Sequence, residues 1–344
     1  MSFQATLVRL MLKLPPGILV KIAGGRPVQL GGRTLDPHFQ FLANGAASQP
    51  PMSSLSAQGA RAGSAAGLAM FATSLPDGVT SEDSEIVLED RTIPTRVYKP
   101  ADQDPNMPLM VFYHFGGGVI GDLDTSHAFC GMMAKICRLP IVSVDYRLAP
   151  EHKWPAGLDD AVAAYEWALL NADSFGALPG QAMVAGDSMG GNFAAIVAQE
   201  MKREHKPQPV FQLLIYPATD VASDTPSMHL FGDSYPLTRD TMEWFMQHYM
   251  PDDADPEDPR LSPIHEMQLD GLAPAIVATA GFDPLVDQGK AYADRLSDAG
   301  VDVDYRCYDS LAHGFTAFVG VAPAAKKACE EICMLLKDKL KELH

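Results

Sequence analysis

Six apolar runs of strand length, each followed by a helical pattern, constrain the fold more than any other feature of this sequence. Runs that are apolar at every position suit strands buried on both faces, as in parallel sheets covered by helices. The alternation therefore predicts an α/β protein with a mostly parallel sheet sandwiched between helices. The runs are Leu109 to Tyr113, Ile141 to Val144, Ala182 to Ala185, Phe211 to Tyr216, Ala275 to Ala280 and Val301 to Cys307; the intervening helical patterns are Ser126 to Cys137, Ala156 to Leu170, Asn192 to Arg203 and Gln288 to Ala299, and a last helix covers Ala324 to Leu343.

Two further regions depart from this alternation. The segments Glu85 to Leu88 and Ile93 to Tyr98 alternate in polarity and predict an antiparallel pair that opens the main domain and brings the sheet to about eight strands. Between Asp220 and Pro263 the alternation stops, and an aromatic and Met-rich helix over Thr241 to Met250 precedes the acidic loop Asp252 to Asp258. We expect this insertion to lie over the carboxyl ends of the strands, where open α/β sheets bind ligands.

Charge and cysteine content exclude several classes of protein. The 344 residues include 43 acidic and 26 basic side chains, and the net charge of −17 disfavours nucleic acid and anionic membranes as partners. Five cysteines without a C-x-x-C pair argue against a disulfide framework and a structural zinc site, and they favour a reducing, cytoplasmic compartment in which the thiols are small buried hydrophobes.

The N-terminal segment is apolar from Leu10 to Ile22 but does not predict a membrane-spanning or secretory segment. Pro15-Pro16 and Lys21 interrupt the run, and no stretch of the sequence approaches 18 uncharged apolar residues. We expect at most a weak amphipathic contact there, with a membrane or with the mouth of the protein's own binding site.

The pentapeptide Gly186-Asp187-Ser188-Met189-Gly190 joins the run ending at Ala185 to the helical pattern beginning at Asn192. Glycines at both ends permit a sharp, strained turn that exposes the serine for nucleophilic attack. An ordinary Gly/Ser loop is the alternative, but the strand before and the helix after favour a nucleophile.

A nucleophilic serine needs a base and an orienting acid, which in α/β-hydrolases follow it in the order serine, acid, histidine. Of the ten histidines, only His313 and the terminal His344 lie well downstream of a second acid at a strand end, and His313 lies directly beyond the last apolar strand. Asp283 is the predicted acid because it follows the run Ala275 to Ala280 by a short Gly281-Phe282 turn. Asp287 competes with it but is better explained as a capping or first-turn acid of the next helix.

The run His114-Phe115-Gly116-Gly117-Gly118 follows another predicted strand. Glycines let backbone N–H groups approach an oxyanion, so this loop and the N–H of Met189 are candidate donors. A flexible loop or a phosphate cradle is the alternative, but the sequence contains no G-x-x-x-x-G-K-[ST].

Five ordered motifs resemble the hormone-sensitive-lipase-like (bacterial family IV) esterases of the α/β-hydrolase superfamily: His114 to Gly118, Asp145 to Ala156, Gly186 to Gly191, Asp283-Pro284-Leu285 and His313-Gly314-Phe315. The resemblance implies the α/β-hydrolase fold, a catalytic triad of Ser188, Asp283 and His313, and oxyanion donors from Gly116, Gly117 and Met189. It also implies scaffold roles for Asp145, Arg147 and Glu151.

A helical cap is the further implication of this resemblance. Its N-terminal part is expected over residues 1–80 and its insertion over 219–262, leaving residues 81–218 and 263–344 as the two parts of the hydrolase core. Two departures from the family pattern are expected to matter: Phe115 replaces the first glycine of His-Gly-Gly-Gly while Gly118 replaces the following aromatic, and Met189 replaces a small residue.

These features together predict a carboxylesterase acting on short- to medium-chain acyl esters without a cofactor or a metal. The same triad could serve an amidase or a lactonase, and loss of catalysis would leave a ligand-binding receptor on the same fold. A homodimer is expected from the resemblance, formed through an edge strand near Val301 to Cys307.

Overall fold

An eight-stranded sheet forms the centre of the protein in the computed structural model, which describes residues 3–343. The strand order is β10-β9-β8-β7-β5-β6-β4-β3; neighbours from β10 to β6 are parallel, and β4 and β3 join antiparallel. This confirms the predicted α/β class and the mostly parallel sheet of about eight strands. The strands are β3 (Val79–Val87), β4 (Thr92–Pro100), β5 (Leu109–Tyr113), β6 (Ile141–Val144), β7 (Ala182–Asp187), β8 (Gln212–Ile215), β9 (Ala275–Phe282) and β10 (Val303–Ala312).

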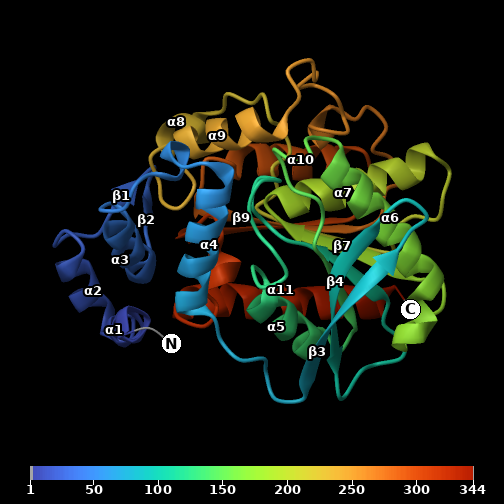
Figure 1. The fold of residues 1–344 in the computed structure, drawn as a ribbon, viewed down its shortest axis with the longest axis horizontal. Helices are drawn as coiled ribbons and strands as arrows, with labels where there is room; N and C mark the ends of the chain where they lie inside the picture. The colour runs from blue at the N-terminus through green and yellow to red at the C-terminus, as the bar shows by residue number, and fades with distance from the viewer. Residues whose placement is uncertain (1–2, 344) are drawn as a thin grey trace.

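Helices cover both faces of this sheet (Figure 1), as continuous apolar strands require. Alternate side chains of β5 enter different cores: Val111 joins the cluster under α6, α7 and α10, whereas Met110 and Phe112 join the cluster under α5 and α11. The covering helices are α5 (His127–Cys137), α6 (Ala156–Asn171), α7 (Met189–Arg203), α10 (Val286–Asp298) and α11 (Pro323–Glu342), with short 3-10 turns η2 (Ala172–Phe175), η3 (Pro263–His265) and η4 (Phe315–Phe318).

The strands β9 and β10 extend beyond their predicted carboxyl ends, and both lead to candidate site residues. The predicted Gly281-Phe282 turn is wrong because these residues belong to β9, where a side chain at Gly281 would collide with the backbone of Asp309 on β10. The strand β10 continues to Ala312 through an irregularity between Tyr308 and Ala312. Asp283 and His313 are therefore the first residues after the carboxyl ends of β9 and β10.

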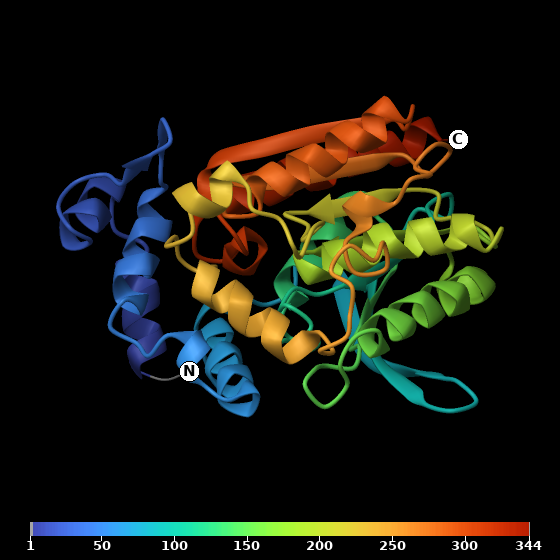
Figure 2. The same cartoon turned by 90° about the horizontal axis from the view of Figure 1, so that it is seen from above.

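The N-terminal residues form short helices, as predicted, and also a small hairpin that the sequence analysis did not predict. The strands β1 (Gln29–Leu30) and β2 (Arg33–Thr34) are joined by Gly31 and Gly32, both with positive φ, a backbone conformation that favours tight two-residue turns. The helices are α1 (Phe3–Met11), α2 (Pro16–Ile22), α3 (Pro37–Ala46) and α4 (Ala57–Phe71), with the 3-10 turn η1 (Met52–Ser54). In Figures 1 and 2 they lie at the end of the molecule away from the C-terminus.

The insertion after β8 contains α8 (Pro226–Leu230) and α9 (Arg239–Tyr249). Trp244 of α9 donates a hydrogen bond to the carbonyl of Leu55, 3.1 Å away, so the insertion contacts the N-terminal helices directly. The division of the chain into cap and core at the residues given above remains a prediction. Among residues 3–343, no helix is both long and apolar enough to cross a membrane.

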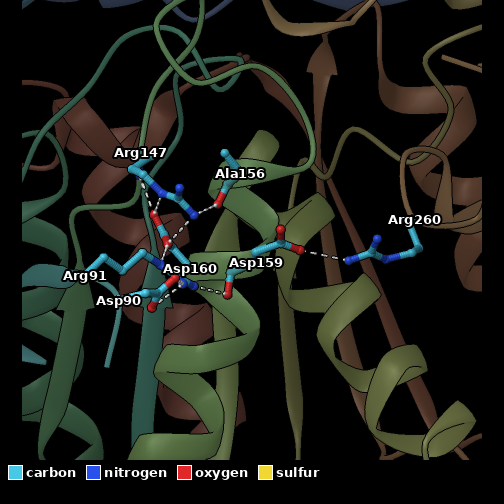
Figure 3. A network of polar contacts seen from close by, with 7 residues as sticks. All are labelled: Asp90, Arg91, Arg147, Ala156, Asp159, Asp160 and Arg260. Atoms are coloured by element: carbon cyan, nitrogen blue, oxygen red, sulfur yellow. Dashed lines mark hydrogen bonds and ion pairs between the residues drawn. The ribbon is translucent and has the colours of Figure 1, made fainter. Parts of the chain in front are cut away.

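A buried carboxylate fastens the β3–β4 hairpin to the core (Figure 3). Asp160 of α6 is 1% exposed and accepts hydrogen bonds from Arg91 Nε at 2.7 Å and from Arg147 Nε at 2.8 Å and Nη2 at 2.9 Å. The backbone N–H of Arg147 donates to it as well, at 3.0 Å. One side chain therefore holds the hairpin end, the segment after β6 and a core helix together, which agrees with the scaffold role expected for Arg147.

Removing this carboxylate should destabilise the protein strongly. We expect Asp160→Asn to lower the free energy of unfolding by about 3 kcal/mol, because two arginines lose their buried partner. The neighbouring Asp159 is half exposed and its carboxylate pairs with Arg260 at 2.9 Å, so Asp159→Asn should cost less than about 1 kcal/mol. Urea denaturation of both variants measures the difference, and equal losses would contradict this account.

Candidate active site

Ser188 occupies a strained turn between β7 and α7. Its φ of 57° and ψ of −117° are unfavourable for a residue with a side chain, at a cost of about 1–3 kcal/mol. The surroundings leave no room to relax the turn, because a side chain at Gly186 would collide with the carbonyl of Gly190, and one at Gly190 with the carbonyl of Tyr113. The two glycines of the pentapeptide thus have the steric role that the sequence predicted.

The structure brings Ser188, His313 and Asp283 together as one hydrogen-bonded series. His313 Nε2 lies 2.9 Å from Ser188 Oγ, and His313 Nδ1 lies 2.7 Å from Asp283 Oδ2. Because a carboxylate only accepts, Nδ1 carries the proton in this arrangement and Nε2 is left to accept the serine proton. The order serine, acid, histidine along the chain thus leads to side chains in direct contact.

Burial and a backbone hydrogen bond hold the acid of this series in place. Asp283 is fully buried, and its other oxygen, Oδ1, accepts the backbone N–H of Leu285 at 2.8 Å. The competing Asp287 lies in the first turn of α10 and accepts the backbone N–H of Ser227 at 2.8 Å, with no contact to His313. His344 lies outside the described residues. The geometry therefore favours Asp283, as the sequence did.

Asp187, which precedes the candidate nucleophile, was not among the predicted site residues. Its side chain is fully buried and accepts hydrogen bonds from Tyr216 at 2.9 Å and from Thr316 at 2.7 Å. Burial raises the pKa of Asp187 to about 6, while these two hydroxyls oppose the shift. Since Thr316 lies three residues beyond His313, Asp187 ties the serine turn to the histidine segment. The sequence feature that could have identified Asp187 is an acidic residue at the end of an apolar strand.

Three consecutive glycines after β5 have positive φ and pack too closely against neighbours for any side chain. A side chain at Gly116 would collide with the carbonyl of Ile120, and those at Gly117 and Gly118 with the rings of Phe245 and Tyr249 on α9. Within residues 3–343, the N–H groups of Gly116, Gly117 and Met189 donate no hydrogen bond to protein atoms. The three predicted oxyanion donors thus line the same cavity as Ser188, and their assignment as donors remains a prediction.

The two departures from the family pattern both face the site. Phe115 is half buried and lines the cavity beside Ser188, while its carbonyl accepts the Nδ1–H of His114 at 2.7 Å. Met189 is 1% exposed and lines the same cavity. Burial lowers the pKa of His114 to about 4, so its imidazole is neutral at pH 7. At Gly118, which replaces the aromatic of the family pattern, a side chain would collide with the ring of Tyr249 on α9.

A cavity of about 1080 Å³ opens over Ser188 and His313. The N-terminal helices and the insertion contribute most of its walls, and apolar side chains predominate. They include Met52, Leu55, Leu68, Phe71, Met242, Phe245 and Met246. Among residues 3–343, no group of three or more His, Cys, Asp and Glu side chains is placed to hold a metal ion. The volume accommodates an ester with both its acyl and its alcohol part.

Comparison with known proteins agrees with the fold. Residues 110–317 match a family model described as alpha/beta hydrolase fold. Carboxylic ester hydrolase LipN of Mycobacterium tuberculosis is 40% identical over 350 residues, covering 98% of this chain and 93% of that protein. Ethyl acetate hydrolase of Pseudomonas putida is 33% identical, covering 84% of this chain and 92% of that one.

Solved structures show the same relationship. An ester hydrolase from the metagenome of Lake Arreo, solved in complex with a bipyridine phosphonate derivative, superposes with a TM-score of 0.85 at 35% identity, over 89% of this chain and 99% of that one. Sequence motifs, sheet topology and relatives thus agree. The chain belongs to the α/β-hydrolases, and within them to the hormone-sensitive-lipase-like family that its motifs resemble.

Proposed function

We propose that this protein is a carboxylesterase that hydrolyses short- to medium-chain acyl esters through an acyl-enzyme. The observation that carries the proposal is the series of hydrogen bonds from Ser188 through His313 to Asp283, which opens into a largely apolar cavity. The relatives named above, an ester hydrolase and an ethyl acetate hydrolase, support an ester as the substrate.

In the first half of the reaction, Nε2 of His313 takes the hydroxyl proton as Ser188 Oγ attacks the ester carbonyl. The buried Asp283 stabilises the resulting imidazolium and keeps its proton on Nδ1. The N–H groups of Gly116, Gly117 and Met189 receive the oxyanion. The tetrahedral intermediate then collapses, and the alcohol leaves with the proton held by His313.

Water completes the cycle. His313 takes a proton from a water molecule, which attacks the acyl-enzyme, and the second tetrahedral intermediate uses the same oxyanion donors. As the bond to Ser188 Oγ breaks, His313 returns the proton to that oxygen and the acid is released. Met52, Met242 and Met246 give the cavity an apolar, adaptable wall suited to an uncharged acyl chain. No step requires a cofactor.

We also propose a cytoplasmic location and a homodimer. Four of the five free cysteines are buried, which suits a reducing compartment; Cys307 differs from the expectation because it lies half exposed on β10. The strand β10 is an edge of the sheet, so its outer side offers backbone groups for pairing with a second copy.

The nucleophile can be tested by removing one oxygen atom. Ser188→Ala should lower kcat for p-nitrophenyl butyrate by at least about 10⁴-fold, because acylation is lost while substrate binding remains. Ser126, also buried but without a side-chain hydrogen-bond partner, offers a matched control, and Ser126→Ala should retain activity within about threefold. Unchanged hydrolysis by Ser188→Ala would overturn the proposal.

The acid can be tested by comparing two aspartates four residues apart. Asp283→Asn should lower kcat by about 10⁴-fold, because the amide stabilises the wrong tautomer of His313. Asp287→Asn should change kcat less than about tenfold, since that side chain binds the backbone of Ser227. The reverse ranking in steady-state kinetics would reassign the acid.

The oxyanion loop can be tested with a double-mutant cycle. Gly117→Ala should lower kcat by about 10²-fold, because the new methyl collides with the Phe245 ring and displaces the Gly117 N–H. Phe245→Ala should cost less than about tenfold alone and restore at least about tenfold in the double variant. Additive losses across the cycle would show that Phe245 does not position this loop.

A further inference from the structure

Positive charge is segregated at the N-terminus of an otherwise acidic protein. The first 35 residues carry Arg9, Lys13, Lys21, Arg26 and Arg33 and no acidic side chain, so all 43 carboxylate side chains lie from Asp36 onward. The net charge of −17, which argues against contact with anionic surfaces for the whole protein, therefore does not describe this end of it.

Exposed apolar side chains are concentrated in the same segment. Leu7 (47% exposed) and Leu10 (63%) lie three residues apart on α1, and Ile18 (43%) and Ile22 (44%) lie four apart on α2. Spacings of three and four place each pair on one side of its helix. With Val28, these are five of the eleven large hydrophobic residues that are exposed in the described chain.

Other side chains at these two helices already face the protein. Leu12, which directly follows α1, and Leu19 of α2 are buried, at 3% and 0% exposure. A helix whose apolar side chains extend beyond its buried ones is expected to be covered there as well. The packing of α1 on α4 and of α2 on α3 leaves the two exposed apolar pairs uncovered.

Three of the five basic residues remain available to a partner. Arg9 donates to the carbonyls of Met70 and Ala72, and Arg33 pairs with Asp309 at 3.0 Å. Lys13, Lys21 and Arg26 are exposed, and no carboxylate within residues 3–343 forms an ion pair with them.

We propose that the α1–α2 surface, made of Leu7, Leu10, Lys13, Ile18, Lys21 and Ile22, docks onto an anionic lipid bilayer. Apolar side chains flanked by lysines are the combination that places a helix in the bilayer interface. Charge complementarity selects a lipid surface with negative headgroups. The acidic remainder of the protein is repelled from the same surface, so this end alone approaches it.

Docking at this surface would place the candidate active site close to the lipid. The helices α3 and α4, on which α2 and α1 pack, contribute wall residues such as Ala46 and Leu68 to the cavity over Ser188. Figures 1 and 2 show α1 and α2 outside these two helices, at the periphery of the molecule. The proposal concerns binding alone and does not rest on the proposed esterase activity.

Flotation with lipid vesicles tests it. The full-length protein should float with vesicles of mixed phosphatidylglycerol and phosphatidylcholine and not with phosphatidylcholine alone. Lys13→Gln with Lys21→Gln should weaken binding about 30-fold, as expected for two basic charges near an anionic surface. Leu10→Gln with Ile18→Gln should weaken it at least about tenfold at unchanged charge.

Matched variants on α11 and α6 serve as controls. Lys326→Gln with Lys327→Gln repeats the charge change, and Leu170→Gln with Met334→Gln repeats the apolar change, the latter pair being 81% and 50% exposed. Both should float as the wild type does, and so should Ser188→Ala, which separates binding from catalysis. Circular dichroism checks that every variant is folded.

Three results would overturn the proposal. The wild type could fail to float with the anionic vesicles, or it could float equally with phosphatidylcholine alone. The α1–α2 variants could bind as their controls do. A change of oligomeric state in the Leu10→Gln/Ile18→Gln variant, measured by sedimentation velocity, without a change in flotation would assign the surface to a second copy of the chain.

Discussion

The strained turn at Ser188 is the constraint on which the rest of the site depends. Gly190 packs on the carbonyl of Tyr113, so the start of α7 touches the end of β5, and the serine is held above the sheet with positive φ. The turn is maintained because strands on both sides are fully buried and cannot yield. The same close approach places the glycine loop that follows β5 beside the serine, so nucleophile and oxyanion donors come from one packing contact.

Two buried carboxylates, Asp283 and Asp187, complete this arrangement. Asp283 holds the ring of His313 and a backbone N–H, and Asp187 holds the hydroxyls of Tyr216 and Thr316. Each is fully buried, a costly placement unless partners satisfy its oxygens. Both oxygens of Asp283 have a partner, whereas both hydroxyls bind Oδ2 of Asp187 and no hydrogen bond within residues 3–343 reaches its Oδ1. In this way groups from the ends of β7, β8, β9 and β10 are fixed relative to one another. The helix α9 closes the site from above by packing its aromatic rings on glycines of the oxyanion loop.

Much of this could be predicted from the sequence, because buried parallel strands carry a strong apolar signal: β5 and β6 begin and end at the predicted residues. The ends of β9 at Phe282 and of β10 at Ala312 could not be predicted, because they depend on a backbone contact and on an irregular register between the two strands. The packing of α9 over the glycines and the partners of Asp187 depend on contacts between distant segments, which no local pattern encodes. The apolar N-terminal segment is visible in the sequence, but which of its side chains remain exposed depends on how α1 and α2 pack on the protein.

The central claim is that Ser188 is the activated nucleophile, and covalent trapping tests it most directly. The folded protein would be treated with a serine-directed alkyl phosphonate ester, followed by intact mass measurement and peptide mapping. The account predicts one adduct per chain, located on Ser188 and formed much more slowly in the Asp283→Asn variant. An unmodified protein, or an adduct on a different residue, would contradict it.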